Sequence, residues 1–303
     1  MMTLMMIPIC LALCFAPLLR SVINKTKAFF AGRKGPPWLQ PYRDIRKLLG
    51  KDAVYSKTTT WLFRAGPLVS LTGVMLALTL LPMGSIPTLL AFPGDFLFLA
   101  YLLAQGRLFV VLAALDTGSS FEAMGASREV QFGALTEPVL LLAIATLSHH
   151  ASMFSLSSIY QTGVPDIWSR APIILLILAL VFFVVLLSEN SRMPVDDPTT
   201  HLELTMIHEV MVLDHGGPDL AFIEYMQALK LWIFSTLIVG LFMPSIELPV
   251  GLQCAIFLAG MGVVGVAIGL TETMMARLRM EKVPQLIVGA GMLSVFTLLL
   301  EVF

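Results

Sequence analysis

Charged side chains are scarce in this sequence. Lysine and arginine contribute 19 residues and aspartate and glutamate 20, so that 13% of the 303 residues are charged and 57% are hydrophobic. Soluble domains carry about 25% charged residues. So few charges could hardly cover the surface of a soluble core of this size, which excludes a soluble globular enzyme and predicts a polytopic membrane protein. The net charge of −1 also argues against nucleic-acid binding.

Cysteine is rarer still, because Cys10, Cys14 and Cys254 are the only three. Three thiols cannot by themselves supply the four ligands of a tetrahedral metal site or of an iron–sulfur cluster. Cys10 and Cys14 share one helix face, but in an apolar helix such a pair is far more often lining than ligand. We therefore expect no cofactor in this chain, and any redox centre in a partner protein.

Long apolar runs are what the sequence has in abundance. A membrane-spanning helix needs about 20 mostly apolar residues, and eight windows meet that requirement. They predict an all-α polytopic membrane protein with a single membrane domain over residues 1–303. No basic residue precedes the first apolar run, so we interpret that run as an anchor and not as a signal peptide. The windows are 3–23, 62–82, 95–115, 131–151, 171–189, 227–245, 250–271 and 284–303.

The basic residues predict the orientation, since loops rich in lysine and arginine stay in the cytoplasm. Eleven of the 19 basic residues fall between Arg20 and Arg64, and the third, fifth and seventh connections raise that side to sixteen. Only Arg170 falls clearly on the opposite side. We therefore expect an inner (plasma) membrane protein with cytoplasmic loops at 24–61 and 190–226 and with both termini outside.

The first loop predicts a short amphipathic interfacial helix from Tyr42 to Leu49, with apolar residues on one side and basic residues on the other. One interpretation is an anchor that lies on lipid headgroups. The other is a folded docking surface for a soluble partner, because the Gly-Pro-Pro-Trp turn before the helix is more elaborate than an anchor requires. The candidate docking residues are Gly35, Pro36, Gln40, Arg43, Asp44, Arg46 and Lys47.

Two charged residues lie inside apolar windows, where a charge costs about 2.5–3.5 kcal/mol on insertion scales. Glu137 should therefore face the bundle interior or water, and Arg107 needs a carboxylate that Glu137 or Glu189 could supply. Three further acids lie nearer the interface, where a helix start would favour them equally well. These are Asp116, Glu122 and Glu129, with Arg128 placed to neutralise one of them.

The fifth connection, residues 189–226, is the densest polar cluster and holds three of the five histidines. Histidine titrates near neutral pH and buried carboxylates can be brought toward it, so this mixture suits proton relay. A metal site built from His201, Glu203, His208 and Asp214 is the rival interpretation, although the spacing matches no metal motif. The candidate proton path is Asp116, Glu122, Glu129, Glu137, Glu189, Asp196, His201 and Glu203, with Arg107, Arg128 and Arg192 as charge partners.

Several motifs together resemble a known family. Gly35-Pro36 through Gln40, Tyr42 to Leu48, Leu115 to Ser119, Gly125 to Glu129, and Glu137-Pro138 are similar to the membrane subunit of formate hydrogenlyases and other group 4 NiFe hydrogenases. That subunit is homologous to subunit 1 (H) of complex I, and the resemblance extends from the first loop to the last helix. The run around Asp116 and Arg128 points to the hydrogenase branch.

The resemblance also covers the fifth connection, where the family carries a path of carboxylates. Glu189, Arg192, Pro194, Asp196 and Glu203-Leu204 stand at matching places, whereas Thr199 and His201 replace family glutamates and Val195 replaces a phenylalanine. We expect Glu137→Gln, Glu189→Gln and Glu203→Gln to leave the complex assembled but to uncouple it, and Thr199→Glu to be tolerated. If these acids only pair with arginines, the variants should instead lose assembly.

The resemblance implies a non-catalytic subunit that anchors a cytoplasmic redox module and couples it to proton or sodium movement. Its implied partners are NiFe-hydrogenase-like large and small subunits, iron–sulfur proteins and antiporter-like membrane subunits, with the NiFe centre and iron–sulfur clusters in those partners. A subunit 1 (H) of a quinone-reducing complex I is the first alternative. A stand-alone secondary ion transporter is the second, although such proteins often contain inverted repeats and none is evident here.

Overall fold

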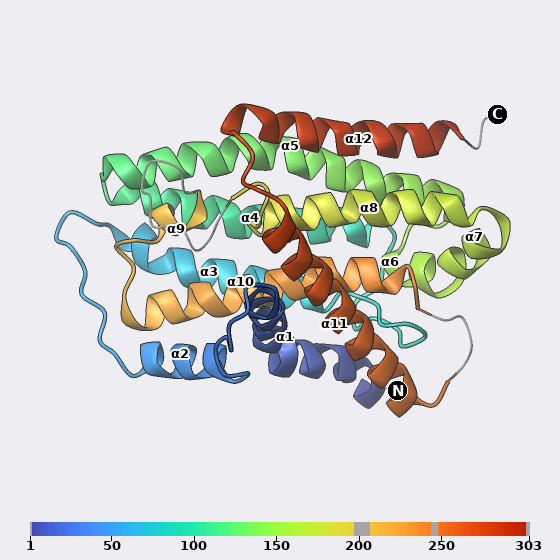
Figure 1. Ribbon diagram of the computed structural model, residues 1–303, viewed down its shortest axis with the longest axis horizontal. Coiled ribbons are helices and arrows are strands. Elements are labelled where there is room, and N and C mark those ends of the chain that lie inside the picture. The colour runs from blue at the N-terminus through green and yellow to red at the C-terminus, as the bar shows by residue number, and fades with distance from the viewer. Residues whose placement is uncertain (1, 197–206, 244–247, 301–303) are drawn as a thin grey trace.

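A computed structural model describes residues 2–196, 207–243 and 248–300, and the regular structure of these residues is helical apart from one isolated bridge between Met83 and Ile86 (Figure 1). Within the described residues, eight helices are long and apolar enough to cross a membrane. The predicted all-α architecture with eight spans is therefore confirmed. The eight are α1 (Met2–Phe30), α3 (Trp61–Leu78), α4 (Asp95–Asp116), α5 (Ser120–Ala151), α8 (Pro172–Glu189), α10 (Gly217–Gly240), α11 (Val250–Met274) and α12 (Val283–Leu299).

Short helices occupy the connections. The segment α2 (Gln40–Leu49) matches the predicted amphipathic helix, and none of its residues is fully buried, as expected of a helix that lies at an interface. Helices α6 (Leu156–Ser158), η1 (Ile159–Gly163) and α7 (Val164–Arg170) form the connection between α5 and α8. The fifth connection contains α9 (His208–Met211), and η2 (Met280–Lys282) precedes α12.

Helix α10 is the centre of the bundle. It contacts α1, α2, α3, α8 and α11, and it is the span with the largest buried share among those of the described chain. Helices α5, α8 and α12 pack together on one side, whereas α11 runs obliquely to the other long helices (Figure 1).

Small residues let the spans approach closely, as is typical of helix packing in membranes. Between α3 and α4, the hydroxyl of Ser70 donates to the carbonyl oxygens of Gly66 at 2.6 Å and of Gly106 at 2.9 Å. A Cβ atom on Gly66 would lie 2.9 Å from the Cβ of Ala113. This contact fixes α4 and with it Arg107, which lies one residue after Gly106.

Several predicted boundaries were wrong. Helix α1 continues to Phe30, α5 begins at Ser120 and not near 131, and α10 begins at Gly217 and not near 227. Helix α1 therefore extends into the predicted loop 24–61, and α10 begins within the predicted loop 190–226. The added turns carry polar residues that pair inside the protein, and a hydropathy window stops where such residues begin.

Candidate functional site

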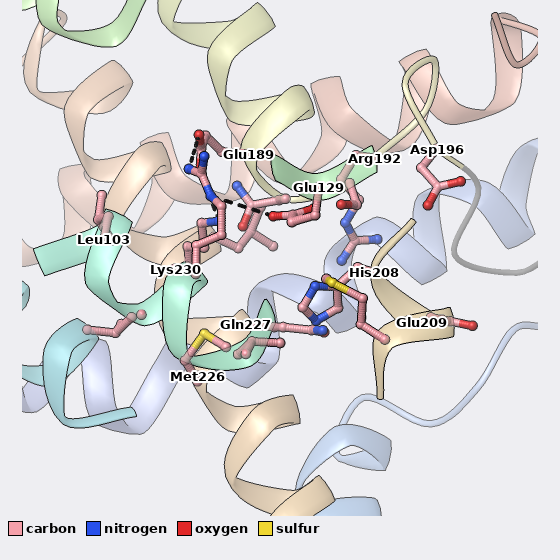
Figure 2. A pocket seen from close by; sticks show the side chains of 18 of the residues that line it. Leu103, Glu129, Glu189, Arg192, Asp196, His208, Glu209, Met226, Gln227 and Lys230 are labelled. Carbon is pink, nitrogen blue, oxygen red and sulfur yellow. Dashed lines mark hydrogen bonds and ion pairs between the residues drawn. The ribbon is translucent and has the colours of Figure 1, made fainter. Parts of the chain in front are cut away.

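A cavity of about 70 Å³ lies among α1, α3, α4, α5, α10 and the segment that follows α8, and it has room for a few water molecules. Its described wall carries equal numbers of acidic and basic side chains. Glu189 and Lys230 lie on one side of it, and Arg192, His208 and Glu209 lie on the other (Figure 2). The charged lining residues are Arg20, Arg107, Arg192, Lys230, Glu129, Glu189, Asp196 and Glu209, with His208 beside them.

Glu189, the last residue of α8, is the centre of this arrangement. One carboxylate oxygen lies 2.6 Å from Nη2 of Arg107, and the other lies 2.9 Å from Nζ of Lys230. The side chain of Glu189 is only 3% exposed. A buried carboxylate is stable only when it is paired and hydrogen-bonded, and here two cations from two different spans provide the pairing.

Arg107 extends the cluster toward the protein surface. Its guanidinium lies 3.0 Å from Glu137 and 3.7 Å from Glu129, both on α5. Gly133 leaves the room that this requires, because a Cβ atom there would overlap the guanidinium. The Glu137 side chain is 36% exposed, so that Arg107 connects the buried Glu189 to a carboxylate at the surface of the bundle. Glu137 and Glu189 are the two partners that the sequence offered for Arg107.

A second set of ion pairs joins the segment after α8 to α1 and α11. Glu272 forms ion pairs with Arg192 at 3.2 Å and with Lys27 at 2.7 Å. Burial lowers the pKa of Arg192, and the charge of Glu272 works against that effect. Asp196 pairs with Arg277 at 2.9 Å and accepts a hydrogen bond from the backbone N–H of Ile207 at 2.8 Å.

His208 and Arg20 complete the charged wall. Burial lowers the pKa of His208, and its Nε2 atom has no hydrogen-bond partner among the described residues. Arg20 pairs with Glu224 and approaches Gln227. Arg20 and Glu224 also line a second cavity of about 280 Å³ between α1, α2 and α10, so Arg20 borders both cavities.

Not every predicted path residue lies in this site. Asp116 accepts hydrogen bonds from the backbone N–H and the hydroxyl of Thr60, which is the residue that caps α3. Glu122 is buried and accepts from the backbone N–H of Asp214 at 3.1 Å. Neither these two nor Arg128 lines the cavity.

Part of the predicted site lies outside the described residues, namely Thr199, His201 and Glu203. The proton-path role of His201 and Glu203 therefore stays a prediction. Among the residues that the structure does describe, histidine, cysteine, aspartate and glutamate side chains form no group of three placed to hold a metal ion.

The predicted docking residues spread over the first loop. Pro36, Gln40 and Asp44 line the second cavity, and the amide of Gln40 donates to the Asp44 carboxylate at 2.8 Å. Gly35 has a φ of +65°, which favours glycine, and a Cβ there would lie 2.6 Å from the Cβ of Ala28. The remaining three occupy exposed positions of α2 and are Arg43, Arg46 and Lys47.

The sequence profile of the NADH dehydrogenase family matches residues 2–302. The chain belongs to the NADH dehydrogenase family. It is 35% identical to formate hydrogenlyase subunit 4 of Escherichia coli (strain K12) over 89% of each chain. It is 32% identical to hydrogenase-4 component C of the same organism over 77% of this chain and 72% of that one.

More distant members of the NADH dehydrogenase family include the H subunit of the NADH-quinone oxidoreductase of Anaplasma phagocytophilum (strain HZ), with 26% identity over 78% of this chain and 74% of that one. A chain of the membrane-bound sulfane sulfur reductase, an archaeal respiratory membrane complex, shares the fold with a TM-score of 0.84 at 20% identity over 99% of this chain and 98% of that one. The protein is thus a multi-pass membrane subunit related to oxidoreductase complexes.

Several charged residues of the site were not predicted from the sequence. Lys230 lies inside an apolar window like Arg107, and that alone could have marked it as a partner for Glu189. Glu272 falls one position past the predicted end of its span. The predicted pairing also omitted Arg20 and Glu224, which meet across 204 positions of sequence.

Proposed function

We propose that this chain is the non-catalytic anchor and coupling subunit of a formate hydrogenlyase-like or group 4 NiFe-hydrogenase-like membrane complex. Its identity to formate hydrogenlyase subunit 4 and hydrogenase-4 component C exceeds its identity to the NADH-quinone oxidoreductase protein of Anaplasma phagocytophilum. In this proposal the chain docks a cytoplasmic redox module and links its electron transfer to proton or sodium movement.

The observation that carries the proposal is the sharing of one cation by three carboxylates. Arg107 lies within ion-pair distance of Glu129, Glu137 and Glu189. Protonating one of these acids removes its charge, and the guanidinium is then drawn toward the other two. Charge can therefore be redistributed between the charged cavity and the surface-exposed Glu137. Arg107 keeps a carboxylate partner throughout, and an unpaired arginine in the membrane would be costly.

The partner and cofactor assignments follow from this proposal. Hydrogenase-like large and small subunits and iron–sulfur proteins would carry the NiFe centre and the clusters, and antiporter-like subunits would continue the ion path in the membrane. The first loop and α2 are the proposed docking surface. Three of their candidate residues line the second cavity, and Arg20, which pairs with Glu224 there, also borders the charged cavity.

A subunit 1 (H) of a quinone-reducing complex I is the second candidate, favoured by the 26% identity to an NADH-quinone oxidoreductase protein. The charged cavity does not favour it. Sites for small-molecule ligands usually measure about 300–1,000 Å³, and the charged cavity measures about 70 Å³ within the described residues.

Purification in mild detergent tests the proposal. We expect NiFe-hydrogenase-like and iron–sulfur subunits to co-elute with this chain, and the isolated complex to exchange electrons with hydrogen or formate without added quinone. A complex that reduces quinone and is blocked by quinone-site inhibitors would establish the second candidate instead. A chain that moves ions with no co-eluting subunit would contradict both.

A further inference from the structure

A cationic pocket of about 520 Å³ lies where the end of α1 meets α11, apart from the charged cavity. Its described lining contains three basic side chains and no acidic one. Lys27, which directly follows the lining residue Thr26 on α1, pairs with Glu272, whereas the three pocket cations have no carboxylate within ion-pair distance among the described residues. The lining residues are Lys25, Thr26, Phe29, Phe30, Arg33, Lys34 and Val266.

The backbone after α1 holds the three cations together. Gly32 has a φ of +65°, and the backbone N–H of Arg33 donates to the carbonyl oxygen of Ala28 at 2.8 Å, which turns the chain back over the last helical turn. The ammonium of Lys25 donates to the carbonyl oxygen of Lys34 at 2.9 Å. The same ammonium lies 5.9 Å from the centroid of the Trp38 ring, and because an ammonium has three donors, Lys25 keeps at least one for a ligand.

The other wall of the pocket is apolar and comes from α11. Gly265 and Gly269 bring α11 against α1, since a Cβ on Gly265 would lie 2.9 Å from Leu19 and one on Gly269 would lie 2.7 Å from Thr26. Val266 therefore lies level with the end of the apolar run of α1 and is 40% exposed. The exposed rings of Phe29 and Phe30 pack edge to face beside it, 5.5 Å apart.

The pocket thus combines three cations with an apolar wall, near the point where the apolar run of α1 ends. An anionic phospholipid has the same polarity, and basic pockets at the ends of membrane helices bind such headgroups. A soluble acidic protein would need the cations but not an apolar wall on α11. We propose that this pocket binds one anionic phospholipid, with the phosphate on Lys25, Arg33 and Lys34 and an acyl chain along Val266.

The test compares two charge-matched double variants of the protein, purified with its partners in mild detergent. Arg33→Gln with Lys34→Gln removes two pocket cations and leaves the backbone carbonyl that holds Lys25. Lys51→Gln with Lys57→Gln removes two exposed cations of the same loop that do not line the pocket. Native mass spectrometry measures how much phosphatidylglycerol, or phosphatidylcholine with the same acyl chains, each protein retains over a concentration series.

We expect the wild-type protein to prefer phosphatidylglycerol. Each basic side chain near an anionic headgroup strengthens binding about fivefold, so the pocket variant, which lacks two of them, should bind phosphatidylglycerol about 25-fold more weakly, whereas the control variant should match the wild type. Val266→Trp places a larger side chain where the acyl chain would lie and changes no charge, so this variant should also bind phosphatidylglycerol more weakly.

Three outcomes would overturn the proposal. Equal losses of phosphatidylglycerol binding in the two double variants would show that the lipid is attracted diffusely to the charges of the loop and has no specific site in the pocket. Competition by soluble glycerol phosphate at the same concentration as the lipid would show an anion site that makes no use of the apolar wall. Unchanged lipid binding together with loss of the soluble subunits from the pocket variant would show that this surface docks a protein.

Discussion

Removing the charge of Glu189 should destabilise the bundle far more than removing the charge of Glu137. The variant Glu189→Gln leaves Lys230, whose side chain is 13% exposed, without its carboxylate, which lies 2.9 Å away in the wild type, whereas Arg107 keeps Glu137 at 3.0 Å. Breaking a buried ion pair from one side costs about 3–5 kcal/mol. Since one of the two cations stays paired, we expect the lower end, about 3 kcal/mol.

A double variant separates this electrostatic cost from a general packing defect. Lys230→Met removes the charge that Glu189→Gln leaves without its carboxylate. The double variant Glu189→Gln with Lys230→Met should therefore recover about 2 kcal/mol of the lost free energy of unfolding, within the range of coupling between contacting residues. Glu137→Gln is the matched control, because its side chain is 36% exposed and Arg107 keeps Glu189 at 2.6 Å, so that this variant leaves no cation of the cluster without a carboxylate.

Denaturant unfolding in detergent, followed by helical circular dichroism, measures these differences. The electrostatic explanation would be wrong if Glu189→Gln lowered the free energy of unfolding by no more than Glu137→Gln does. It would also be wrong if adding Lys230→Met to Glu189→Gln lowered the free energy of unfolding further. This expectation revises the sequence-based one for Glu189, since the structure shows a pairing role that its position alone did not.

Three further predictions concern other parts of the chain. A single cysteine at Ile45 should react with membrane-impermeant reagents only after the membrane is opened, and labelling from outside intact cells would reverse the predicted orientation. Asp44→Lys should release the soluble subunits from the purified complex, and an intact complex at physiological salt would support the lipid-anchor interpretation of α2. Burial against Phe63 lowers the pKa of His215 to about 4 from its ordinary 6.5. Between pH 6.5 and 4 His215 is protonated in the unfolded chain but not in the folded protein, so the free energy of unfolding should fall by about 3 kcal/mol as the pH drops over this range. His215→Phe, which keeps a stacked ring, should flatten the dependence of the free energy of unfolding on pH over the same range.

The fold was largely predictable from the sequence because apolar length is a strong signal in a membrane. The eight spans and the amphipathic α2 needed only hydropathy and charge placement. Helix ends were less predictable, since Glu122 and Glu224 lie in helical turns whose polar side chains find partners only in the folded protein. A hydropathy window has no means of recording such partners.

The site was predictable in part for the same reason. Arg107 inside an apolar window required a carboxylate, and the structure places Glu137 and Glu189 there. Asp116 shows the limit, because this acid near a span end binds Thr60, the capping residue of α3, and does not line the cavity. Sequence gives the kind of charge but not the direction of the side chain.

Ion movement by the reconstituted complex shows whether the carboxylates around Arg107 couple electron transfer to ion transport. Vesicles containing the wild-type complex or the Glu137→Gln variant would be supplied with the same electron donor, and ions moved would be measured per pair of electrons transferred. We expect the Glu137→Gln complex to transfer electrons at the wild-type rate but to move fewer ions, because Arg107 has lost the carboxylate that leads to the surface. Wild-type ion movement in an intact Glu137→Gln complex would contradict this expectation.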